Sequence, residues 1–405
     1  MPLLSGDNGG RPNMDSDRNP FLITRRQFVT SSTAALALTG FLHAEQTITA
    51  PVGERSSHGT DRLPLRVIID TDPGVDDAFA LLLAMRSPEL KIEAITAVAG
   101  NVPLELTLPN ALRMVEIAGR ADIPVAAGAR RPLLRRLVTA VYAHGDNGLA
   151  GAIFPEPKLA PVGESAAEFI QKTIRKYPGE VTLITIGPLT NVATALNADP
   201  ELAGMVPSLV MMGGSLSGGN ITPAAEFNIY VDPEAARIVF QSGIPVTMVG
   251  LDVTRRTSLT DEHARTLEAG QSPVSRAAAT IARKAIEQHR QAGFPAGPNM
   301  HDPLAVAAFL DSSLLEWKDY YVDVETAGEL TAGETLGYSS RAGASQPRSA
   351  TEKPNLVIRG SAPTLAGSRT SSVLRDKAVP NTKVAVDVDS TRFFDLLIGR
   401  LSAKH

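Results

Sequence analysis

Four aspartates lie within eight consecutive residues of this chain, in the segment DTDPGVDD at positions 70–77. Four like charges this close repel one another strongly unless something neutralises them. A hard divalent cation does so, because it prefers carboxylate and carbonyl oxygens as ligands. Pro73 and Gly74 predict a tight turn that folds the acids back towards one point. The segment therefore favours a metal site.

Two other interpretations of this acidic segment stay open. Asp76 and Asp77 could cap a helix, since a helix N-terminus favours negative charge, but capping explains two acids and not four. A phosphatase-type motif would instead use Asp70 as nucleophile and Asp72 as acid. A calcium loop of the EF-hand type fits poorly, because position 12 counted from Asp70 is Leu81 rather than Glu.

The elements that would position these acids alternate between strands and helices. Short apolar runs predict strands over 65–70, 91–100, 182–187, 207–214, 245–251 and 383–389. Apolar residues at helical spacing predict helices over 76–86, 104–119, 188–197, 233–242, 261–292 and 390–402, and after residue 302. This alternation indicates an α/β fold with a doubly wound, mainly parallel central sheet and flanking helices, whose ligands bind at the carboxyl ends of the strands.

Further polar residues follow the predicted strands or begin a helix. They are Asn101, Asn191, Asn220, Glu226, Asn228, His301 and Asp302. Because the carboxyl ends of parallel strands converge on one crevice, we expect these side chains to lie near the acidic segment. Paired donors and acceptors of this kind suit a ligand rich in hydroxyl groups. Each residue alone could also be a turn residue, a cap or a solvated side chain.

Composition excludes several classes of protein. The chain has 405 residues, of which 43% are hydrophobic and 20% are charged, as in ordinary globular proteins. The net charge of −4 lacks the basic surplus of nucleic-acid binders, so no nucleic-acid partner is expected. Cysteine is absent, which excludes disulfides, thiolate catalysis and cysteine–zinc sites. A metal ion would therefore be held mainly by oxygen ligands.

The N-terminal region has the order of a secretory signal. Arg25 and Arg26 precede an apolar run over about 28–42, and Ala44 is a plausible cleavage residue. The arginine pair resembles a twin-arginine export signal, which predicts a periplasmic or secreted location. No stable membrane insertion is expected, because the run is shorter than the ~20 apolar residues that a bilayer requires.

The expected domain organisation follows from these patterns. We expect an export signal peptide over 1–44, a linker over 45–62 and a catalytic domain over 63–405. Residues 339–380 are rich in Ser, Arg, Gly, Ala and Pro with weak periodicity, and we expect a flexible insertion there.

Several long motifs resemble those of the inosine–uridine preferring nucleoside hydrolases. They are DTDPGVDDAFAL, AVAGNV, HGDNGLAG, GPLTNVATAL, MMGGSLSGGNITPAAEFNIYVDPEAA and HDPLAV. The resemblance covers residues from about 65 to 335 and resumes over 383–402. It implies calcium-dependent hydrolysis of the N-glycosidic bond of ribonucleosides to free base and ribose, by a homodimer or homotetramer.

The resemblance also implies roles for the acids. The Ca²⁺ ligands would be the carboxylates of Asp72, Asp77 and Asp302 and the main-chain carbonyl of Ile186, where other members often have Thr. Asp72 would also be the general base for the attacking water. Carboxylates near the sugar ring suit this reaction, because its transition state resembles an oxocarbenium ion.

The resemblance assigns the sugar contacts to a second group of residues. Asp76 would bind the ribose 2′-hydroxyl, and Asn101 would orient water or ribose. The 3′- and 5′-hydroxyls and the packing of the sugar would fall to Asn220, Glu226, Asn228, Met212 and Phe227.

Two histidines would face the leaving base. His301 matches the residue credited with its protonation, and His144, on a loop that covers the base in relatives, is the second choice. His263 and His289 fall in predicted helices and are expected at the surface. The only tryptophan, Trp317, lies outside the motifs, so strong purine stacking is not indicated. Base preference is expected to depend on the loops around 142–150 and 285–300.

Two other functions remain open. The first is an exported, non-catalytic ribonucleoside-binding protein with the same pocket. The second is a metal-dependent phosphohydrolase that uses Asp70. An enzyme is favoured because a binding protein needs no water-activating acid, and the chain has Asp72, Asp76, Asp77 and His301 together. A phosphohydrolase would need a downstream lysine and a second acidic pair, for which there is no clear candidate.

Overall fold

The computed structural model describes residues 63–339 and 379–404. The export signal predicted over 1–44, the linker predicted over 45–62 and nearly all of the insertion predicted over 339–380 lie outside the described residues. Among the helices that are described, none combines the length and the apolar character needed to span a membrane.

A central sheet of nine strands organises the described residues, in the order β3-β2-β1-β4-β5-β6-β9-β7-β8. The strands are β1 (Leu65–Thr71), β2 (Leu90–Ala97), β3 (Val125–Ala127), β4 (Val181–Thr185), β5 (Leu209–Met212), β6 (Val246–Val249), β7 (Leu315–Val324), β8 (Thr335–Tyr338) and β9 (Thr382–Val388). Neighbours from β3 to β9 pair in parallel, and β7 runs antiparallel to both β9 and β8. The predicted mainly parallel sheet is confirmed.

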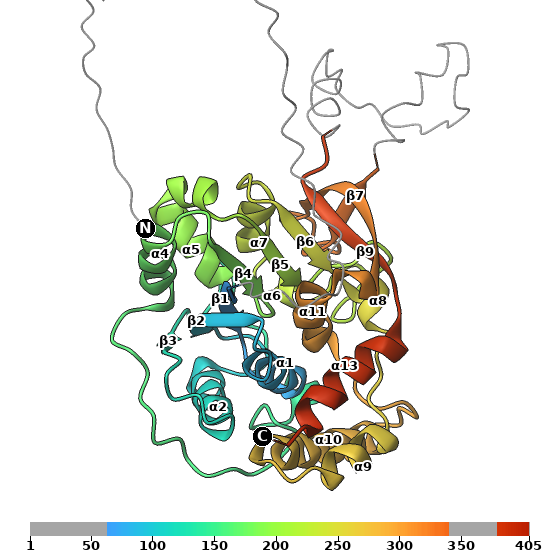
Figure 1. Ribbon diagram of the computed structural model, residues 1–405. Helices are drawn as coiled ribbons and strands as arrows, with labels where there is room; N and C mark the ends of the chain where they lie inside the picture. Colours follow the sequence, from blue (N-terminus) through green and yellow to red (C-terminus); the bar gives the residue numbers. More distant parts are fainter. Residues whose placement is uncertain (1–62, 340–378, 405) are drawn as a thin grey trace, which may run out of the picture. The chain divides into compact units, whose positions relative to one another are not determined.

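Helices cover both faces of this sheet (Figure 1). The longer ones are α1 (Val75–Met85), α2 (Leu104–Ile117), α4 (Ala166–Lys176), α5 (Thr190–Ala198), α7 (Pro233–Phe240), α9 (Asp261–Ala269), α10 (Pro273–Gln291), α11 (His301–Leu310) and α13 (Ser390–Ser402). The short ones are α3 (Val141–His144), α6 (Phe227–Val231) and α8 (Leu251–Thr254). Because side chains alternate along a strand, Val67 and Ile69 face α1, α2, α10, α11 and α13. Ile68 faces the opposite core with α4, α5 and α7.

Most predicted elements are present with shifted ends, but the single helix predicted over 261–292 is wrong. The chain breaks there into α9 and α10. Gly270 ends α9, and the Ser272 side chain accepts a hydrogen bond from the main-chain N–H of Ser275 at 3.0 Å to start α10. Pro273 occupies the first turn, where its missing N–H costs nothing. The sequence analysis did not predict β3, β7, β8 or α4.

The buried helix α1 positions the acidic segment. Every residue from Val75 to Met85 is buried, which fits a helix that is apolar on all sides after its first turn. Asp76 and Asp77 belong to that first turn, directly after the turn that leaves β1. The two acids are therefore held at the carboxyl end of the sheet and away from bulk water.

Candidate active site

Three buried carboxylates from two helices meet at the carboxyl end of the sheet. Asp76 and Asp77 come from α1, and Asp302 comes from the first turn of α11. One carboxylate oxygen of each lies within 4.8 Å of the others. This group contains two of the three predicted acidic ligands, Asp77 and Asp302, together with Asp76, to which the resemblance gave a sugar contact.

Asp72 adjoins this group and has a free oxygen. Its Oδ2 accepts a hydrogen bond from the main-chain N–H of Asn101 at 2.7 Å, while its buried Oδ1 has no partner among the residues that the structure describes. A Cβ atom at Gly100 or Gly187 would overlap the Asp72 carboxylate, so only glycine permits this close approach of the main chain. The carboxylate is therefore fixed in direction, with one oxygen left for a ligand.

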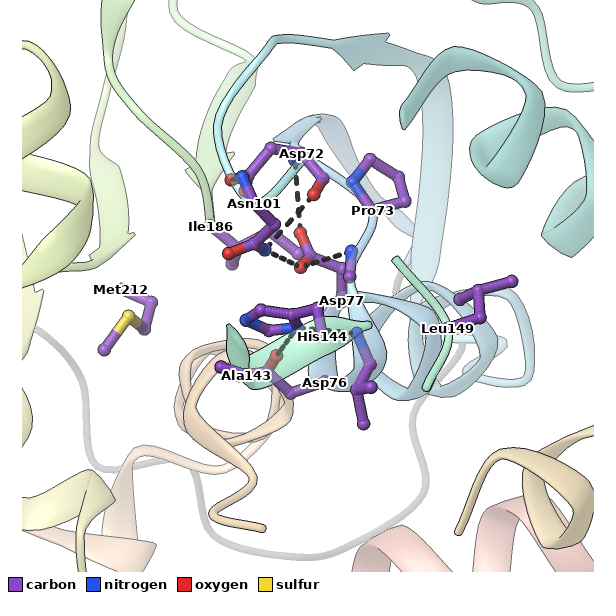
Figure 2. Close-up of polar contacts among 12 residues, drawn as sticks. Asp72, Pro73, Asp76, Asp77, Asn101, Ala143, His144, Leu149, Ile186 and Met212 are labelled. Carbon is purple, nitrogen blue, oxygen red and sulfur yellow. Dashed lines mark hydrogen bonds and ion pairs between the residues drawn. The ribbon is translucent and has the colours of Figure 1, made fainter. Parts of the chain in front are cut away.

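Asn101 and the turn hold Asp72 and Asp77 together (Figure 2). The Asn101 amide donates to Asp77 Oδ2 at 2.9 Å and to the Asp72 carbonyl at 3.2 Å. Asp77 also accepts from Thr71 Oγ1 at 2.6 Å and from the main-chain N–H of Gly74 at 2.9 Å. These donors leave Asp77 with few free lone pairs and a single orientation.

The acids hold their protons unusually tightly. Burial and then the charge of Asp77 raise the pKa of Asp72 well above its ordinary value, and the same two causes raise the pKa of Asp76 to about 7. Burial and the charges of Asp76, Asp77 and Asp72 raise the pKa of Asp302 well above its ordinary value. Ionising this set at neutral pH requires a positive charge among them.

A hard divalent cation fits this donor set. The available ligands are carboxylate and carbonyl oxygens, one of which is the unpartnered Asp72 Oδ1. The Ile186 carbonyl, predicted as a ligand, lies in the same pocket and accepts a hydrogen bond from Asn228 Nδ2 at 3.3 Å. None of the described residues that line the pocket is lysine or arginine, so a metal ion is the fitting source of positive charge.

The pocket above the acids brings together most of the predicted site residues. It has a volume of about 140 Å³. Its lining includes Asp76, Asn101, His144, Ile186, Met212, Asn220, Glu226, Phe227, Asn228, His301 and Asp302. Asp72 and Asp77 do not line it but are hydrogen-bonded to Asn101, which does. The sequence analysis therefore grouped residues that lie far apart in the chain and close together in the fold.

The loop after β5 and the start of α6 supply a polar wall of the pocket, formed by Asn220, Glu226 and Asn228. Glu226 is 3% exposed, so it is not a solvated side chain. It caps α6 by accepting from the main-chain N–H groups of Asn228 at 3.0 Å and Ile229 at 3.1 Å. Asn220 Oδ1 accepts from the main-chain N–H of Phe227 at 2.9 Å. Burial raises the pKa of Glu226, although these donors oppose the shift.

His144 and His301 enter the pocket as neutral rings. Burial lowers the pKa of His144 to about 3 and that of His301 to about 4. The main-chain N–H of Val75 donates to His144 Nδ1 at 3.0 Å, so the neutral ring carries its proton on Nε2. His301 Nδ1 shares a hydrogen bond of 2.7 Å with Thr254 Oγ1.

The surface position expected for His289 is wrong, because His289 lines the pocket with Tyr142. Tyr142 lies in the segment 142–150 and His289 in the segment 285–300, which the sequence analysis expected to set base preference. That expectation was the only sequence signal that pointed to these two residues. Gln288 ties these segments together by donating to the carbonyls of Tyr142 at 3.2 Å and Ala143 at 3.1 Å. His263 stacks instead on Phe394 of α13, with ring centroids 4.0 Å apart.

Asp70 is badly placed to be a nucleophile. It is 1% exposed and is not among the lining residues. Its Oδ1 accepts from Thr96 Oγ1 at 2.5 Å and from Asn191 Nδ2 at 2.8 Å. Burial raises its pKa to about 7 against the effect of these two donors. The phosphohydrolase interpretation therefore loses its central residue.

Fold and site together define an α/β protein with a buried aspartate cluster suited to a metal ion, beside a polar pocket at the carboxyl ends of its strands. The sequence profile of the inosine-uridine preferring nucleoside hydrolases matches residues 67–395. The chain belongs to this family and is an enzyme that hydrolyses ribonucleosides.

Several relatives resemble the chain over nearly their whole length. It is 43% identical to the pyrimidine-specific ribonucleoside hydrolase RihA of Citrobacter koseri over 343 residues, which cover 84% of this chain and 99% of that protein. A plant nucleoside hydrolase, PpNRh1, has a similar solved structure with a TM-score of 0.72 and 33% identity, covering 84% and 100% of the two chains. The purine-preferring ribonucleoside hydrolase of Gardnerella vaginalis has a TM-score of 0.71 and 31% identity, covering 83% and 98%.

Proposed function

We propose that this enzyme holds Ca²⁺ at the aspartate cluster and cleaves pyrimidine ribonucleosides in preference to purine ribonucleosides. The observation that carries the ion site is the convergence of Asp76, Asp77 and Asp302 beside the unpartnered Asp72 Oδ1. Oxygen-only donors and several negative charges suit Ca²⁺ better than a softer metal. The Ile186 carbonyl would complete the protein's contribution, as the family resemblance implies.

The ion and the acids would divide the chemistry at the sugar. When bound, Ca²⁺ would neutralise the carboxylates, hold the vicinal hydroxyls of ribose and lower the pKa of a water molecule. Asp72 Oδ1 would accept the proton of the water that attacks the anomeric carbon. The N–H of Asn101 keeps the other Asp72 oxygen occupied, so the free oxygen is the one presented for this transfer.

The polar wall of the pocket would hold the rest of the ribose. Asp76 would accept from the 2′-hydroxyl, while Asn220, Glu226 and Asn228 would bind the 3′- and 5′-hydroxyls. Met212 and Phe227 line the same pocket and would pack against the ring. Buried carboxylates on both sides of the sugar would stabilise the positive charge that develops as the glycosidic bond breaks.

Departure of the base needs a hydrogen-bond donor, and His144 and His301 line the pocket where the base would lie. Because burial keeps both rings neutral, each would polarise the base through an N–H group rather than act as a free imidazolium. His144 presents its Nε2 proton, since Val75 occupies Nδ1. His301 remains the proposed donor to the leaving base, with Thr254 orienting its ring.

The proposed base preference rests on the relatives and on the pocket lining. The 43% identical RihA is named as pyrimidine-specific, whereas the purine-preferring relative from Gardnerella vaginalis is 31% identical. Tyr142 and His289 line the pocket, and no described tryptophan does. The lining therefore lacks the largest aromatic surface for stacking a purine.

A substrate panel tests the proposal directly. The full chain, freed of metal by a chelator, is incubated with uridine, cytidine, inosine and guanosine, and released ribose is measured before and after Ca²⁺ is added. We expect ribose release that depends on Ca²⁺ and a higher kcat/KM for uridine and cytidine. Equal ribose release with chelator and with added Ca²⁺ would contradict the dependence on Ca²⁺. Faster cleavage of inosine than of uridine would contradict the proposed preference for pyrimidines.

We also propose that residues 1–44 export the enzyme to the periplasm or the medium, where it would act on extracellular ribonucleosides. The support is the order of the arginine pair, the apolar run and Ala44 in the sequence. The proposed homodimer or homotetramer rests on the family resemblance alone, and sedimentation of the purified chain would test it.

A further inference from the structure

Asn191 joins three strand ends beneath the pocket. It lies in the first turn of α5 and is 2% exposed. Its amide Nδ2 donates to Asp70 Oδ1 at 2.8 Å and to the carbonyl of Ala97 at 3.3 Å. Its Oδ1 accepts from the main-chain N–H of Ala129 at 2.8 Å. One side chain therefore ties α5 to β1, to β2 and to the segment after β3.

The Asp70 carboxyl depends on this amide for one of its two side-chain hydrogen bonds. Both of its side-chain donors, Thr96 Oγ1 and Asn191 Nδ2, bind Oδ1, and the buried Oδ2 has no partner among the described residues. Thr96 is the in-register neighbour of Asp70 on β2. Loss of Asn191 would leave a buried carboxyl held by one hydroxyl, which is costly because buried polar groups need partners.

The turn that precedes Asn191 lies against the Asp72 carboxylate of the proposed ion site. It joins β4 to α5 through Gly187, and a Cβ atom there would overlap Asp72 Oδ1. Just before it, Ile186 donates its main-chain N–H to the carbonyl of Asp70 at 2.8 Å. The position of the first turn of α5 therefore determines where the main chain meets Asp72 and where the Ile186 carbonyl points.

Gly128 allows the main chain after β3 to lie close to the Asn191 side chain. A Cβ atom at Gly128 would overlap the side-chain amide of Asn191, so the main chain after β3 approaches this amide as closely as it can. Asn191 is not among the residues that line the pocket. It can affect an ion or a substrate only through the groups that it holds.

We propose that Asn191 is a positioning residue that locks Asp70 and the turn at Gly187, so that the Asp72 carboxylate and the Ile186 carbonyl converge on the ion. This inference deepens the proposed function and rests on its ion site. Asn191 does not line the pocket, so its loss should act through the groups that it holds and weaken ion binding even without a substrate.

The variant Asn191→Asp tests this with little change of shape. It replaces the Nδ2 donor by an oxygen, which removes the hydrogen bond to the Ala97 carbonyl and places a second carboxyl against Asp70, where the two repel unless they share a proton. Loss of a hydrogen bond to a charged group corresponds to about a tenfold or larger change in an equilibrium constant. We expect at least about tenfold weaker Ca²⁺ binding by calorimetry on the substrate-free, chelator-treated full chain, and a similar loss of kcat.

The reciprocal exchange Asp70→Asn with Asn191→Asp supplies the rescue. An asparagine at position 70 donates back to the aspartate at 191, which restores the link to β1 but not the longer hydrogen bond to the Ala97 carbonyl. We therefore expect Ca²⁺ affinity to recover most of what Asn191→Asp loses. Asp70→Asn alone keeps an oxygen that accepts from Thr96 and Asn191, and it should change the affinity little. A double variant as weak as Asn191→Asp would overturn the proposal.

Asn381→Asp is the matched control. Asn381 also bridges main-chain groups, donating to the carbonyls of Phe240 and Val322 at 3.0 Å and accepting from the Val322 N–H at 2.8 Å, but it does not line the pocket. It should lower the melting temperature and leave Ca²⁺ affinity unchanged.

The outcomes separate the inference from the proposed function. If Asn191→Asp lowers only the melting temperature, as the control does, Asn191 is structural and the inference is wrong while the ion site stands. If the wild-type chain binds no divalent ion, the proposed function and the inference both fail. Should Asn191→Asp not fold, Asn191→Ser, which keeps a shorter donor, takes its place with the same expected loss of affinity.

Discussion

Replacing Asp72 with asparagine isolates the charge that the mechanism requires. Asp72→Asn keeps the size of the side chain, and its amide oxygen can still accept from the N–H of Asn101 at the position of Oδ2. Its NH₂ group then takes the place of the unpartnered Oδ1. A donor would stand where the structure offers an acceptor, so both proton transfer from water and ion binding should suffer.

The size of the effect follows from what is lost. Removal of a general base costs about 10²- to 10⁴-fold in rate, and we expect kcat for uridine to fall by at least that lower figure. Loss of one charged ligand should weaken Ca²⁺ binding by about tenfold or more. The metal-free variant should melt at a higher temperature than metal-free wild type, because it no longer buries a carboxyl whose pKa is raised well above the ordinary value by burial and by the charge of Asp77.

The assay is kcat with saturating Ca²⁺ and substrate, beside calorimetric ion binding and thermal melts with and without chelator. Asp311→Asn is the control: Asp311 accepts from the main-chain N–H of Ser313 at 3.0 Å and from the Arg392 guanidinium at 2.9 Å, outside the pocket lining. It should lower stability and spare ion binding. An Asp72→Asn enzyme that keeps more than about a tenth of wild-type kcat would refute the assignment of the base.

Three further predictions concern protonation of the leaving nucleobase, the pKa values of the buried aspartates, and export. His301→Ala should slow uridine cleavage by about 10²-fold or more but spare an activated p-nitrophenyl riboside, whose leaving group needs no proton; equal losses on both substrates would remove its role. Burial raises the pKa of Asp70 and Asp76 to about 7, above the unfolded value near 3.9, so their stabilising contribution is complete below about pH 4 and is lost as pH rises through 7. The chelator-treated protein should therefore melt at a lower temperature at pH 8 than at pH 6, and added Ca²⁺ should narrow the difference; a flat profile without metal would contradict the raised values. Replacing Arg25 and Arg26 by lysine should retain the enzyme in the cytoplasm, as fractionation would show, and normal export would contradict the predicted signal.

Much of the fold could be predicted because its signals are local. The run LRVIID and the pattern after it define β1 and α1 within a few residues. Turn chemistry at Pro73 and Gly74 placed Asp76 and Asp77 in the first turn of a helix. The break between α9 and α10 also has local sequence signals, which are Gly270, Ser272 and Pro273. The sequence analysis missed this boundary because the apolar periodicity continues through it.

The strands that were missed depend on distant partners. The ten residues of β7 show no regular alternation of buried and exposed side chains, and pairing with β9 and β8 defines the strand. β3 has three residues and is defined by its pairing with β2. Segments of this kind carry weak periodicity, so their conformation is decided by tertiary contacts.

By itself, the sequence determined the alternation of strands and helices, the acidic turn and the set of polar residues at strand ends, because each depends on neighbouring residues or on a recurrent motif. Only the tertiary structure decided that Asp302 meets Asp76 and Asp77, that Asp72 keeps one oxygen free and that His289 faces the pocket. It also decided the protonation of these groups, because a pKa depends on burial and on charges brought close by folding. Local spacing places a residue on an element, and packing of elements against one another then determines which groups it touches.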